Sequence, residues 1–311
     1  MAAPHDAVLL LAYGGPTRPE EVRPFLDNIL RGRPIPKERI EEVVRHYEIV
    51  GGASPINRLT FQQAEGLRAL LKNAGPDLPV HVGMRFWNPT IDDALTRMRN
   101  EGSRRAVALI LAPHPSRASR QSYIDAVDAA RGRAGSAAPE IDFTEPFYEH
   151  PQFIEAVAAR IRTAHERVPA SRRAEAALVC TAHSIPAGMA AESGYVGTLE
   201  KTAALTAGAA GFGAWNLAYQ SRSGSPSEAW LEPDIGDALR ALKAGGARDV
   251  VVAPIGFVSD HVEVLYDLDV AARAVAGQIG LGWERAGTAG DHPAFLLMMA
   301  TLVRARVGAA S

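Results

Sequence analysis

Cysteine is almost absent from this 311-residue chain, which contains only Cys180. A single cysteine cannot form an intramolecular disulfide, a four-cysteine zinc site or a four-cysteine iron–sulfur cluster. No apolar run reaches the roughly 18 residues of a membrane span. Residues 1–6 contain no basic region and no long apolar core, so no signal peptide is expected. We therefore expect a cytoplasmic protein without a transmembrane segment.

An excess of charge of one sign is lacking as well. The formal net charge is −2 at pH 7, which gives no reason to expect nucleic acid or an anionic membrane surface as a partner. The sequence also has no Walker loop, no H-E-x-x-H and no G-x-S-x-G, so a serine hydrolase is not indicated. The glycine-rich stretch 208–213 precedes a predicted strand, whereas a dinucleotide-binding fingerprint follows one.

Apolar residues, by contrast, make up 47% of the chain, enough for a large core in one or two domains. Short apolar runs predict strands at residues 7–12, 80–84, 106–112, 141–144, 177–181, 215–219 and 249–255. Helical patterns alternate with them, which indicates parallel sheets with right-handed crossovers. The polar stretch 168–175 is the candidate linker. We predict an α/β protein of two similarly built halves, residues 1–167 and 168–311, with a cleft between them.

Polar residues interrupt the chain where two of these strands end. The strand 177–181 runs on to His183, Ser184 and Pro186, and the first strand runs on to Tyr13 and two glycines. Side chains at the carboxyl ends of parallel strands face the crevice where open α/β sheets bind ligands. His183 and Tyr13 are therefore candidate site residues. A satisfied buried histidine and a packing tyrosine are the alternatives.

Two acidic residues follow the last strong strand. Glu263 and Asp267 lie four apart in a helical pattern, so they share one helix face about one turn apart. This pair is either an ordinary solvated acidic face or a carboxylate pair that binds a cation or takes up protons. Residues 31–39 form a basic stretch, and runs of charge are usually only solvated. Arg31 and Arg33 could nevertheless bind carboxylates of a ligand.

The chain resembles the ferrochelatases, and within them the coproporphyrin type of Gram-positive bacteria. The resemblance covers nearly the whole chain and rests on residues 11–16 (LAYGGP), 31–33 (RGR), 47–55 (YEIVGGASP), 111–114 (LAPH), 121–123 (QSY), 182–186 (AHSIP), 219–222 (YQSR), 230–233 (WLEP) and 256–267 (GFVSDHVEVLYD). It implies two Rossmann-like halves that flank a porphyrin cleft. The implied reaction is insertion of Fe²⁺ into coproporphyrin III to form coproheme in haem biosynthesis.

The resemblance also implies roles for single residues. His183 and Glu263 are the expected catalytic residues and face the metal from one side of the ring, with Asp267 behind them as a third metal-side residue. Tyr13 faces the metal from the other side in the coproporphyrin type. The expected substrate-binding residues are Tyr13, Arg31, His46, Tyr47, Ser54 and Tyr123.

Four positions depart from the pattern of some relatives. Leu30 and His46 stand where those relatives have arginine, and Phe86 stands where they have histidine. Ala271 stands where an acid in those relatives extends the row of carboxylates formed by Glu263 and Asp267. Leu30 and His46 weaken the expectation that this region contacts the propionate groups of the substrate, and Phe86 weakens an auxiliary metal contact at its position.

The chemistry leaves alternatives open at this stage. A neutral imidazole is both a good Fe²⁺ ligand and a base, so His183 could act as either. A carboxylate in a partly desolvated cleft would have a raised pKa suited to proton uptake. Fe²⁺ is then a substrate, no tightly bound cofactor or iron–sulfur cluster is expected, and a monomer is expected. A protoporphyrin ferrochelatase is the main alternative, and a non-catalytic porphyrin or haem carrier and a cobalt chelatase fit less well.

Overall fold

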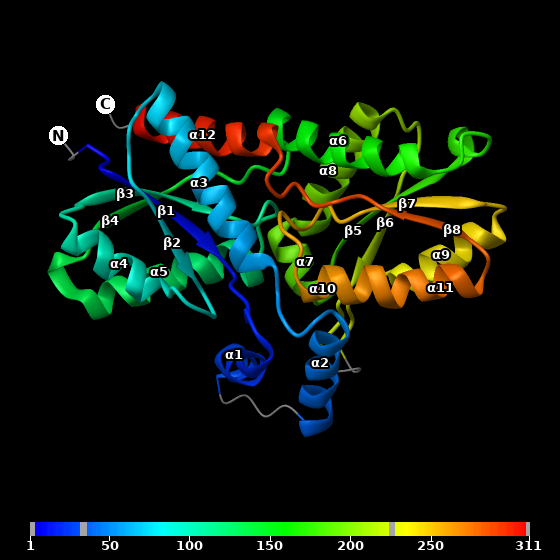
Figure 1. Cartoon of the computed structure of the whole chain (residues 1–311), viewed down its shortest axis with the longest axis horizontal. Helices are drawn as coiled ribbons and strands as arrows, with labels where there is room; N and C mark the ends of the chain where they lie inside the picture. Colours follow the sequence, from blue (N-terminus) through cyan, green and yellow to red (C-terminus); the bar gives the residue numbers. More distant parts are fainter. Residues whose placement is uncertain (1–3, 32–35, 224–227, 309–311) are drawn as a thin grey trace. The chain divides into compact units, whose positions relative to one another are not determined.

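The computed structural model describes residues 4–31, 36–223 and 228–308, so Arg33 lies outside the described residues. Its strands form two four-stranded sheets in which every pairing is parallel, with orders β2-β1-β3-β4 and β6-β5-β7-β8 (Figure 1). The strands are β1 (Ala7–Ala12), β2 (Val80–Met84), β3 (Arg105–Ile110), β4 (Glu140–Phe143), β5 (Ala177–His183), β6 (Asn216–Gln220), β7 (Asp249–Ala253) and β8 (Gly282–Arg285). The predicted class, an α/β protein of two Rossmann-like halves, is confirmed.

Helices cover both faces of the first sheet (Figure 1). The helices of this half are α1 (Val22–Leu30), α2 (Lys37–Ile49), α3 (Ile56–Ala74), α4 (Ile91–Asn100), α5 (Ser122–Ala134) and α12 (Pro293–Gly308), with the short 3₁₀ helices η1 (Pro19–Glu21) and η3 (Gly135–Ala137) and the short π-helix η2 (Arg117–Gln121). One apolar core joins alternate residues of β1, such as Leu9 and Leu11, to Leu95 of α4 and Val127 of α5. This alternation is what a strand buried on both faces requires.

The second sheet is covered in the same way. Its helices are α6 (Pro151–Arg167), α7 (Ala187–Ser193), α8 (Tyr195–Ala210), α9 (Ile235–Ala244), α10 (Val262–Val264) and α11 (Arg273–Gln278), with the π-helix η5 (Leu265–Ala272) and the turn η4 (Arg173–Glu175). A core of Val179, Val250 and Val252 packs against Leu239 of α9 and Leu268 of η5. The helix that carries the two acids is thus anchored on the sheet by its apolar side.

The chain divides into two compact units whose bounds differ from the expected boundary after residue 167. The first unit comprises Met1–Ala112, Ala118–Pro146 and Asp291–Ser311, and the second comprises Pro113–Arg117 and Phe147–Gly290. Helix α6 therefore belongs to the second unit and α12 to the first. The physical reason is packing, because α12 contacts α3 and β3, whereas α6 contacts α8, β7 and β8.

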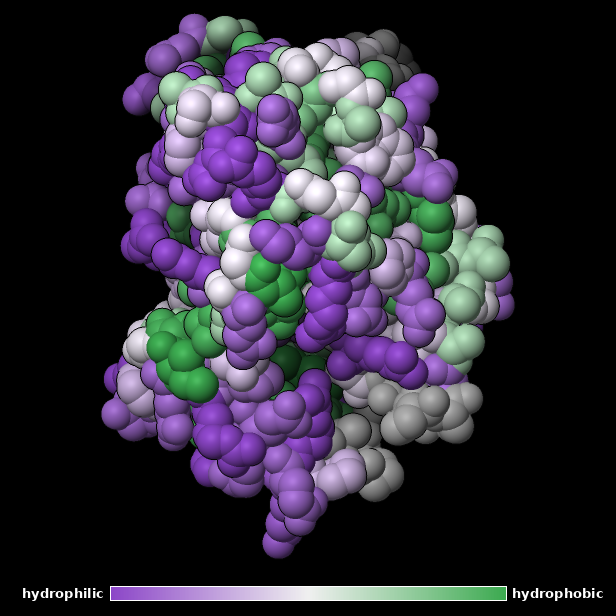
Figure 2. Space-filling view, turned by 90° about the vertical axis from the view of Figure 1, so that its right-hand side faces the viewer, coloured by the Kyte–Doolittle hydropathy of each residue, from purple (hydrophilic) through white to green (hydrophobic). Residues whose placement is uncertain are grey.

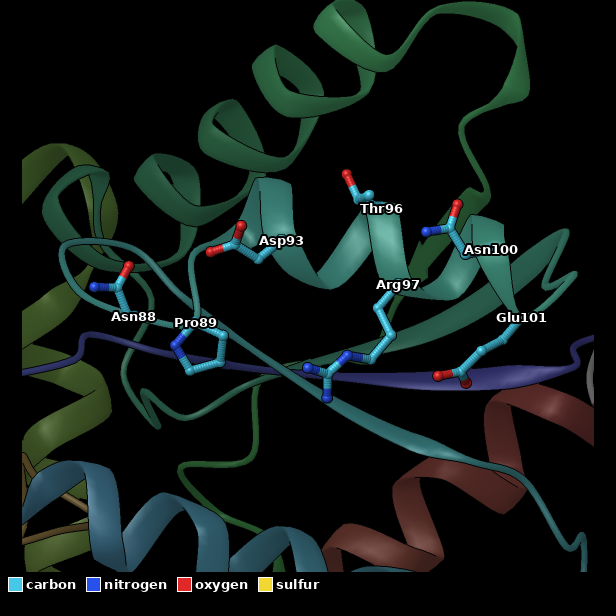
Figure 3. A pocket seen from close by; sticks show the side chains of 7 residues that line it. All are labelled: Asn88, Pro89, Asp93, Thr96, Arg97, Asn100 and Glu101. Atoms are coloured by element: carbon cyan, nitrogen blue, oxygen red, sulfur yellow. The ribbon is translucent and has the colours of Figure 1, made fainter.

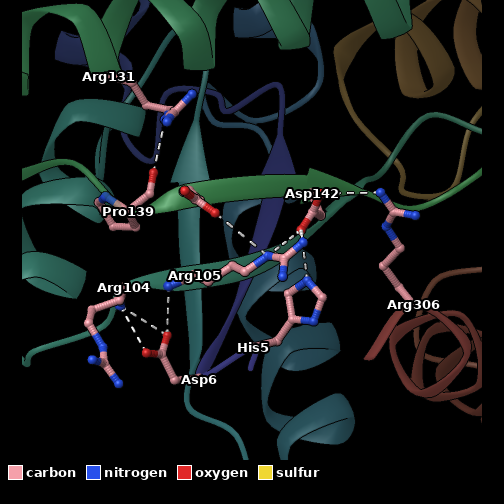
Figure 4. A network of polar contacts seen from close by, with 9 residues as sticks. His5, Asp6, Arg104, Arg105, Arg131, Pro139, Asp142 and Arg306 are labelled. Atoms are coloured by element: carbon pink, nitrogen blue, oxygen red, sulfur yellow. Dashed lines mark hydrogen bonds and ion pairs between the residues drawn. The ribbon is translucent and has the colours of Figure 1, made fainter. Parts of the chain in front are cut away.

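A polar network at the amino end of the first sheet explains why α12 stays with the first unit (Figure 4). Asp142 of β4 accepts hydrogen bonds from the Arg105 side chain at 2.7 Å and from Arg306 of α12 at 3.2 Å, and His5 lies 2.9 Å away. Arg304 adds bonds to the carbonyls of Gly75 and Leu70. Charge-assisted bonds of this kind fix the last helix against the first sheet.

The surface carries few large apolar side chains. Five large apolar residues among those described are exposed by 36% or more: Tyr13 (36%), Ile49 (57%), Phe61 (45%), Leu205 (38%) and Leu297 (40%). On the face in Figure 2 the hydrophobic residues form separate small groups among hydrophilic ones. Among the described residues, every helix is too short or too polar to cross a membrane.

Candidate active site

His183 is the last residue of β5, and the backbone around it is held on several sides. The amide of Ser184 donates to the carbonyl of Gln220 at 2.8 Å, which continues the pairing with β6 past the strand end. The hydroxyl of Tyr195 donates to the His183 carbonyl at 3.3 Å. The Nδ1 atom of His183 lies 2.5 Å from the Ser184 carbonyl, which can only accept. The proton of a neutral imidazole therefore sits on Nδ1, and Nε2 presents its lone pair outward.

The segment after β7 passes close to this strand end because residue 256 is glycine. A Cβ atom at Gly256 would lie 2.7 Å from Cβ of Ala182, a distance that no side chain tolerates. The amide of Gly256 donates to the Thr181 carbonyl at 3.1 Å. Beyond it, the ring of Phe257 packs on the ring of His261 with centroids 4.6 Å apart. The chain is thereby directed back towards His183.

Glu263 lies between two imidazoles. Its Oε2 atom is 3.7 Å from Nε2 of His183 and 3.3 Å from Nε2 of His261. The side chains of His183 and Glu263 are 28% and 38% exposed, and that of His261 is 14% exposed. The two predicted catalytic residues, 80 positions apart in the printed sequence, thus approach each other at the end of the second sheet.

These contacts move the pKa values of the pair in opposite directions. Burial lowers the pKa of His183, but the nearby Glu263 carboxylate outweighs it and the net shift is upward. Burial raises the pKa of Glu263, but His183 and His261 outweigh it and hold the pKa below its usual value. Glu263 is therefore an anion near neutral pH, and the imidazole beside it accepts a proton more readily than a free histidine does.

Asp267 behaves differently from Glu263. Helix α10 widens after Val264 into the π-helix η5, which carries Asp267. Burial is the largest cause that raises the pKa of Asp267 to about 6, and the charge of Glu263 raises it further, against the lowering effect of the Ser221 hydroxyl that donates to it. The raised pKa expected of a buried carboxylate is thus found at Asp267 and not at Glu263.

The site can bind a cation and exchange protons through His183, His261, Glu263 and Asp267, but these side chains do not form a preformed metal site. Within residues 4–31, 36–223 and 228–308, no three His, Cys, Asp or Glu side chains are arranged to hold a metal ion. His183 and Glu263 supply one nitrogen and one oxygen ligand, so a cation there needs further ligands from a bound molecule. Such a site suits a metal ion that is bound only transiently.

Sequence reasoning missed three residues that complete this site. His261 stands two positions before Glu263 and was visible only as part of the motif around the acid. Ser221 adopts a left-handed backbone with φ 64° and reaches Asp267. Gln220 donates from its side chain to the Glu263 carbonyl. Gln220 and Ser221 directly follow the predicted strand 215–219, and this position was the only hint that they could belong to a site. Their spacing in the sequence does not indicate contacts with Glu263 or Asp267.

Tyr13 directly follows β1 in the first unit, whereas His183 is the last residue of β5 in the second. The turn after it needs glycine, because Gly14 has φ 84° and a Cβ atom there would lie 2.9 Å from Trp87. The side-chain amide of Asn57 closes the turn by bonding both the amide and the carbonyl of Gly15 at 2.9 Å. The Tyr13 side chain is left 36% exposed at the strand end.

Aromatic rings and guanidinium groups gather around Phe86, which follows β2. The rings of Tyr13 and Phe86 lie 4.7 Å apart. The guanidinium of Arg85 is 4.6 Å from the Phe86 ring centre, and that of Arg31 is 5.7 Å from it. Cations over ring faces are attracted by the ring quadrupole. The structure thus brings Tyr13 and Arg31 together through Phe86.

The remaining predicted residues of this unit are less accessible. Tyr47 and Tyr123 are 3% and 4% exposed, and Ser54 is 7% exposed beside the turn at Gly15. Burial raises the pKa of Tyr123. His46 lies 3.9 Å from Glu42, and burial lowers its pKa. Their contact with a substrate stays a prediction.

Two open grooves lie away from all of these residues. One has a volume of about 650 Å³ and runs along α4, as Figure 3 shows; it is lined by Asn88, Pro89, Asp93, Thr96, Arg97, Asn100 and Glu101. The other, of about 780 Å³, runs along α9 in the second unit. Neither groove is lined by a predicted site residue.

Known proteins resemble this chain over nearly its whole length. The coproporphyrin III ferrochelatase of Nocardia farcinica is 43% identical over 307 residues, covering 96% of this chain and 87% of that protein. The protein of the same name from Mycolicibacterium paratuberculosis is 44% identical over 301 residues, covering 96% and 87%.

Solved structures with low identity share the fold. SirB from Bacillus subtilis with Fe³⁺ has a TM-score of 0.61 at 12% identity, covering 98% of this chain and 97% of that chain. At this identity the likeness concerns the fold alone.

The ferrochelatase family model matches residues 5–307. This chain therefore belongs to the ferrochelatase family of metal-inserting enzymes.

Proposed function

We propose that this protein inserts Fe²⁺ into coproporphyrin III and so forms coproheme for haem biosynthesis. The coproporphyrin name of the relatives at 43% and 44% identity supports the choice of substrate. The observation that carries the chemistry is the 3.7 Å approach of His183 to Glu263 at the end of β5. Iron is a substrate in this proposal, not a resident cofactor.

Insertion exchanges two pyrrolic N–H bonds for iron–nitrogen bonds and releases two protons together with the water bound to the metal. The lone pair on Nε2 of His183 suits a transient Fe²⁺ ligand and a proton acceptor equally well. Its raised pKa favours proton uptake near neutral pH. We assign the first proton transfer or the last metal contact before insertion to this atom.

The two carboxylates divide the remaining work in this proposal. Glu263 is ionised, so it supplies negative charge for the incoming cation and for a protonated His183. Asp267, with a pKa of about 6, accepts a proton near neutral pH and passes it on. The carboxylate of Glu263 accepts a hydrogen bond from Nε2 of His261, which holds that carboxylate in place.

We assign the substrate contacts to the first unit. Tyr13 meets the opposite face of the ring and coordinates iron there. Arg31 suits a propionate, because a guanidinium binds a carboxylate in bidentate fashion. The other proposed contacts to the ring and its carboxylates are His46, Tyr47, Ser54 and Tyr123.

The experiment is anaerobic mixing of the protein with coproporphyrin III and Fe²⁺ while the Soret band is followed. We expect conversion to the coproheme spectrum, and faster conversion with the four-carboxylate coproporphyrin than with the two-carboxylate protoporphyrin. The His183→Ala variant is the matched control for spontaneous insertion. Equal rates with both porphyrins would remove the coproporphyrin assignment, and no conversion with either would remove the proposed reaction.

We further infer that the protein acts in the cytoplasm as a monomer without a prosthetic group. The lone Cys180 is fully buried, and burial raises the pKa of its thiol to about 12, so it is poorly suited to bind a cluster. Iron and sulfide analysis of the purified protein and light scattering at micromolar concentration test these statements. A stoichiometric cluster or a stable dimer would contradict them.

A further inference from the structure

Arg285, the last residue of β8, binds two carboxylates from a segment distant in sequence. Its Nε and Nη2 atoms donate to Asp269 at 2.6 and 2.9 Å, and its Nη1 and Nη2 atoms donate to Asp260 at 3.3 and 3.1 Å. Both contacts use the planar fork of the guanidinium, a geometry that a lysine cannot reproduce. The Arg285 side chain is only 14% exposed.

The two carboxylates stand on either side of the acidic part of the candidate site. Asp260 precedes His261, and Asp269 follows Asp267 within the π-helix, so Glu263 lies in the stretch between them. One guanidinium therefore fixes both ends of the stretch that carries these three site residues. The end of β8 is the support, since β8 pairs with β7 in the sheet.

The ion pairs are better suited to fix position than to add stability. The side chains of Asp260 and Asp269 are 24% and 32% exposed, so part of the Coulomb energy offsets lost hydration. Pairs of this kind contribute little net stability, yet each defines a distance and an angle. The strongest influences on the pKa of Asp267 are burial, Ser221 and Glu263. Arg285 is not needed for that shift.

We propose that Arg285 is a positioning residue: by holding Asp260 and Asp269, it keeps the intervening stretch in the conformation that places Glu263 against His183. The effect on iron insertion rests on the proposed function, whereas the restraint on residues 260–269 does not. The residue touches neither metal nor porphyrin in this proposal.

The test compares Arg285→Met with the wild type in two measurements. The first is iron insertion, in which we expect kcat to fall about tenfold or more while KM for coproporphyrin III changes by less than about twofold, as lost orientation predicts. The second is amide hydrogen exchange of the porphyrin-free protein. Peptides that cover residues 260–272 should exchange at least about tenfold faster, with little change elsewhere.

Two further variants keep the proposal open to refutation. Arg162→Met is the control, because Arg162 forms an ion pair with Glu155 within α6, at 2.6 Å, and its loss should leave kcat within about twofold. Arg285→Lys retains the charge without the fork and should fall between the wild type and Arg285→Met. If Arg285→Met does not fold, Asp269→Asn is expected to give the same two changes on a smaller scale.

Each outcome decides a separate point. Faster exchange at residues 260–272 together with a lower kcat supports the proposal. Unchanged exchange and unchanged kcat overturn it, as does an equal loss in Arg162→Met. A drop in Tm with unchanged kcat leaves only a structural ion pair and also overturns it. If the wild type inserts no iron, the proposed function fails, and the exchange measurement alone still tests the restraint.

Discussion

The two units share one topology but differ in what they place at its carboxyl end. Both sheets have their first strand in second place, between the second and third strands of the unit. In the first unit the chain leaves β1 through Tyr13 and β2 through Arg85 and Phe86. In the second it leaves β5 at His183, with Glu263 beside it. One end offers rings and guanidinium groups, and the other offers imidazoles and carboxylates.

This difference separates position from chemistry. A parallel sheet places loop residues at its carboxyl edge whatever their identity. The side chains in those loops then decide whether the edge binds a flat anionic molecule or handles a cation and protons. We expect substitutions at the end of the second sheet to act on rate, and those at the end of the first to act on substrate and product binding.

The largest effect should come from His183→Ala. Loss of the imidazole removes both the proton acceptor and the metal contact, so insertion should fall by about 10³-fold or more, on the order of 4 kcal/mol. Absorbance at the Soret band measures the rate, and fluorescence quenching measures porphyrin binding, which should stay close to normal. Near-normal turnover in this variant would break the assignment of the chemistry to the second unit.

Glu263→Gln should cost roughly 10- to 100-fold in rate. The amide keeps the shape of the side chain but removes the charge that supports a cation and raises the pKa of His183. The pH–rate profile should therefore shift towards a lower pKa. Glu284→Gln, which alters the partly buried partner of Arg167, is the control. An unchanged profile would argue against an acid–base role of Glu263.

Asp267→Asn should stabilise the protein at pH 7.5 by about 1–2 kcal/mol. The folded pKa of about 6 exceeds the ordinary value of 3.8, so ionisation of Asp267 costs stability as the pH rises from about 4 through 6. The stability difference between the variant and the wild type should vanish near pH 4. Urea unfolding across this range measures it. A variant that is no more stable at pH 7.5 would show that the carboxylate is not strained.

Tyr13→Phe should have the smallest effect on rate, less than about fivefold. The ring contact with Phe86 at 4.7 Å persists, and only the phenol oxygen is lost. The spectrum of bound coproheme should change, because an oxygen ligand no longer faces the iron. Absorbance of the product complex checks this. A rate loss as large as that of His183→Ala would erase the contrast between the two strand ends.

Much of the fold was predictable from local sequence patterns. All seven predicted strands exist, because buried parallel strands are short continuous apolar runs. The eighth, Gly282–Arg285, was missed because it is a four-residue edge strand with one large apolar side chain. The packing of α12 on the first sheet depends on contacts between chain ends, which no local pattern encodes.

The candidate site was predictable only in part. His183 and Glu263 were identified from motifs and family resemblance, and the comparisons confirm that family. The π-helix, the Ser221 contact and the Arg285 contacts arise from tertiary packing. The opposite pKa shifts of Glu263 and Asp267 depend on which carboxylate meets the histidines, and residue spacing alone does not determine that.

The division of the chain also bears on the order in which it folds during synthesis. Apart from Pro113–Arg117, the second unit is the continuous stretch Phe147–Gly290, whereas the first needs residues 291–311. The second unit can thus complete its core without residues 291–311, whereas the first needs α12. Proteolysis of a chain that stops at Gly290 should leave the second unit protected and cut the first. Equal resistance of both would contradict this order.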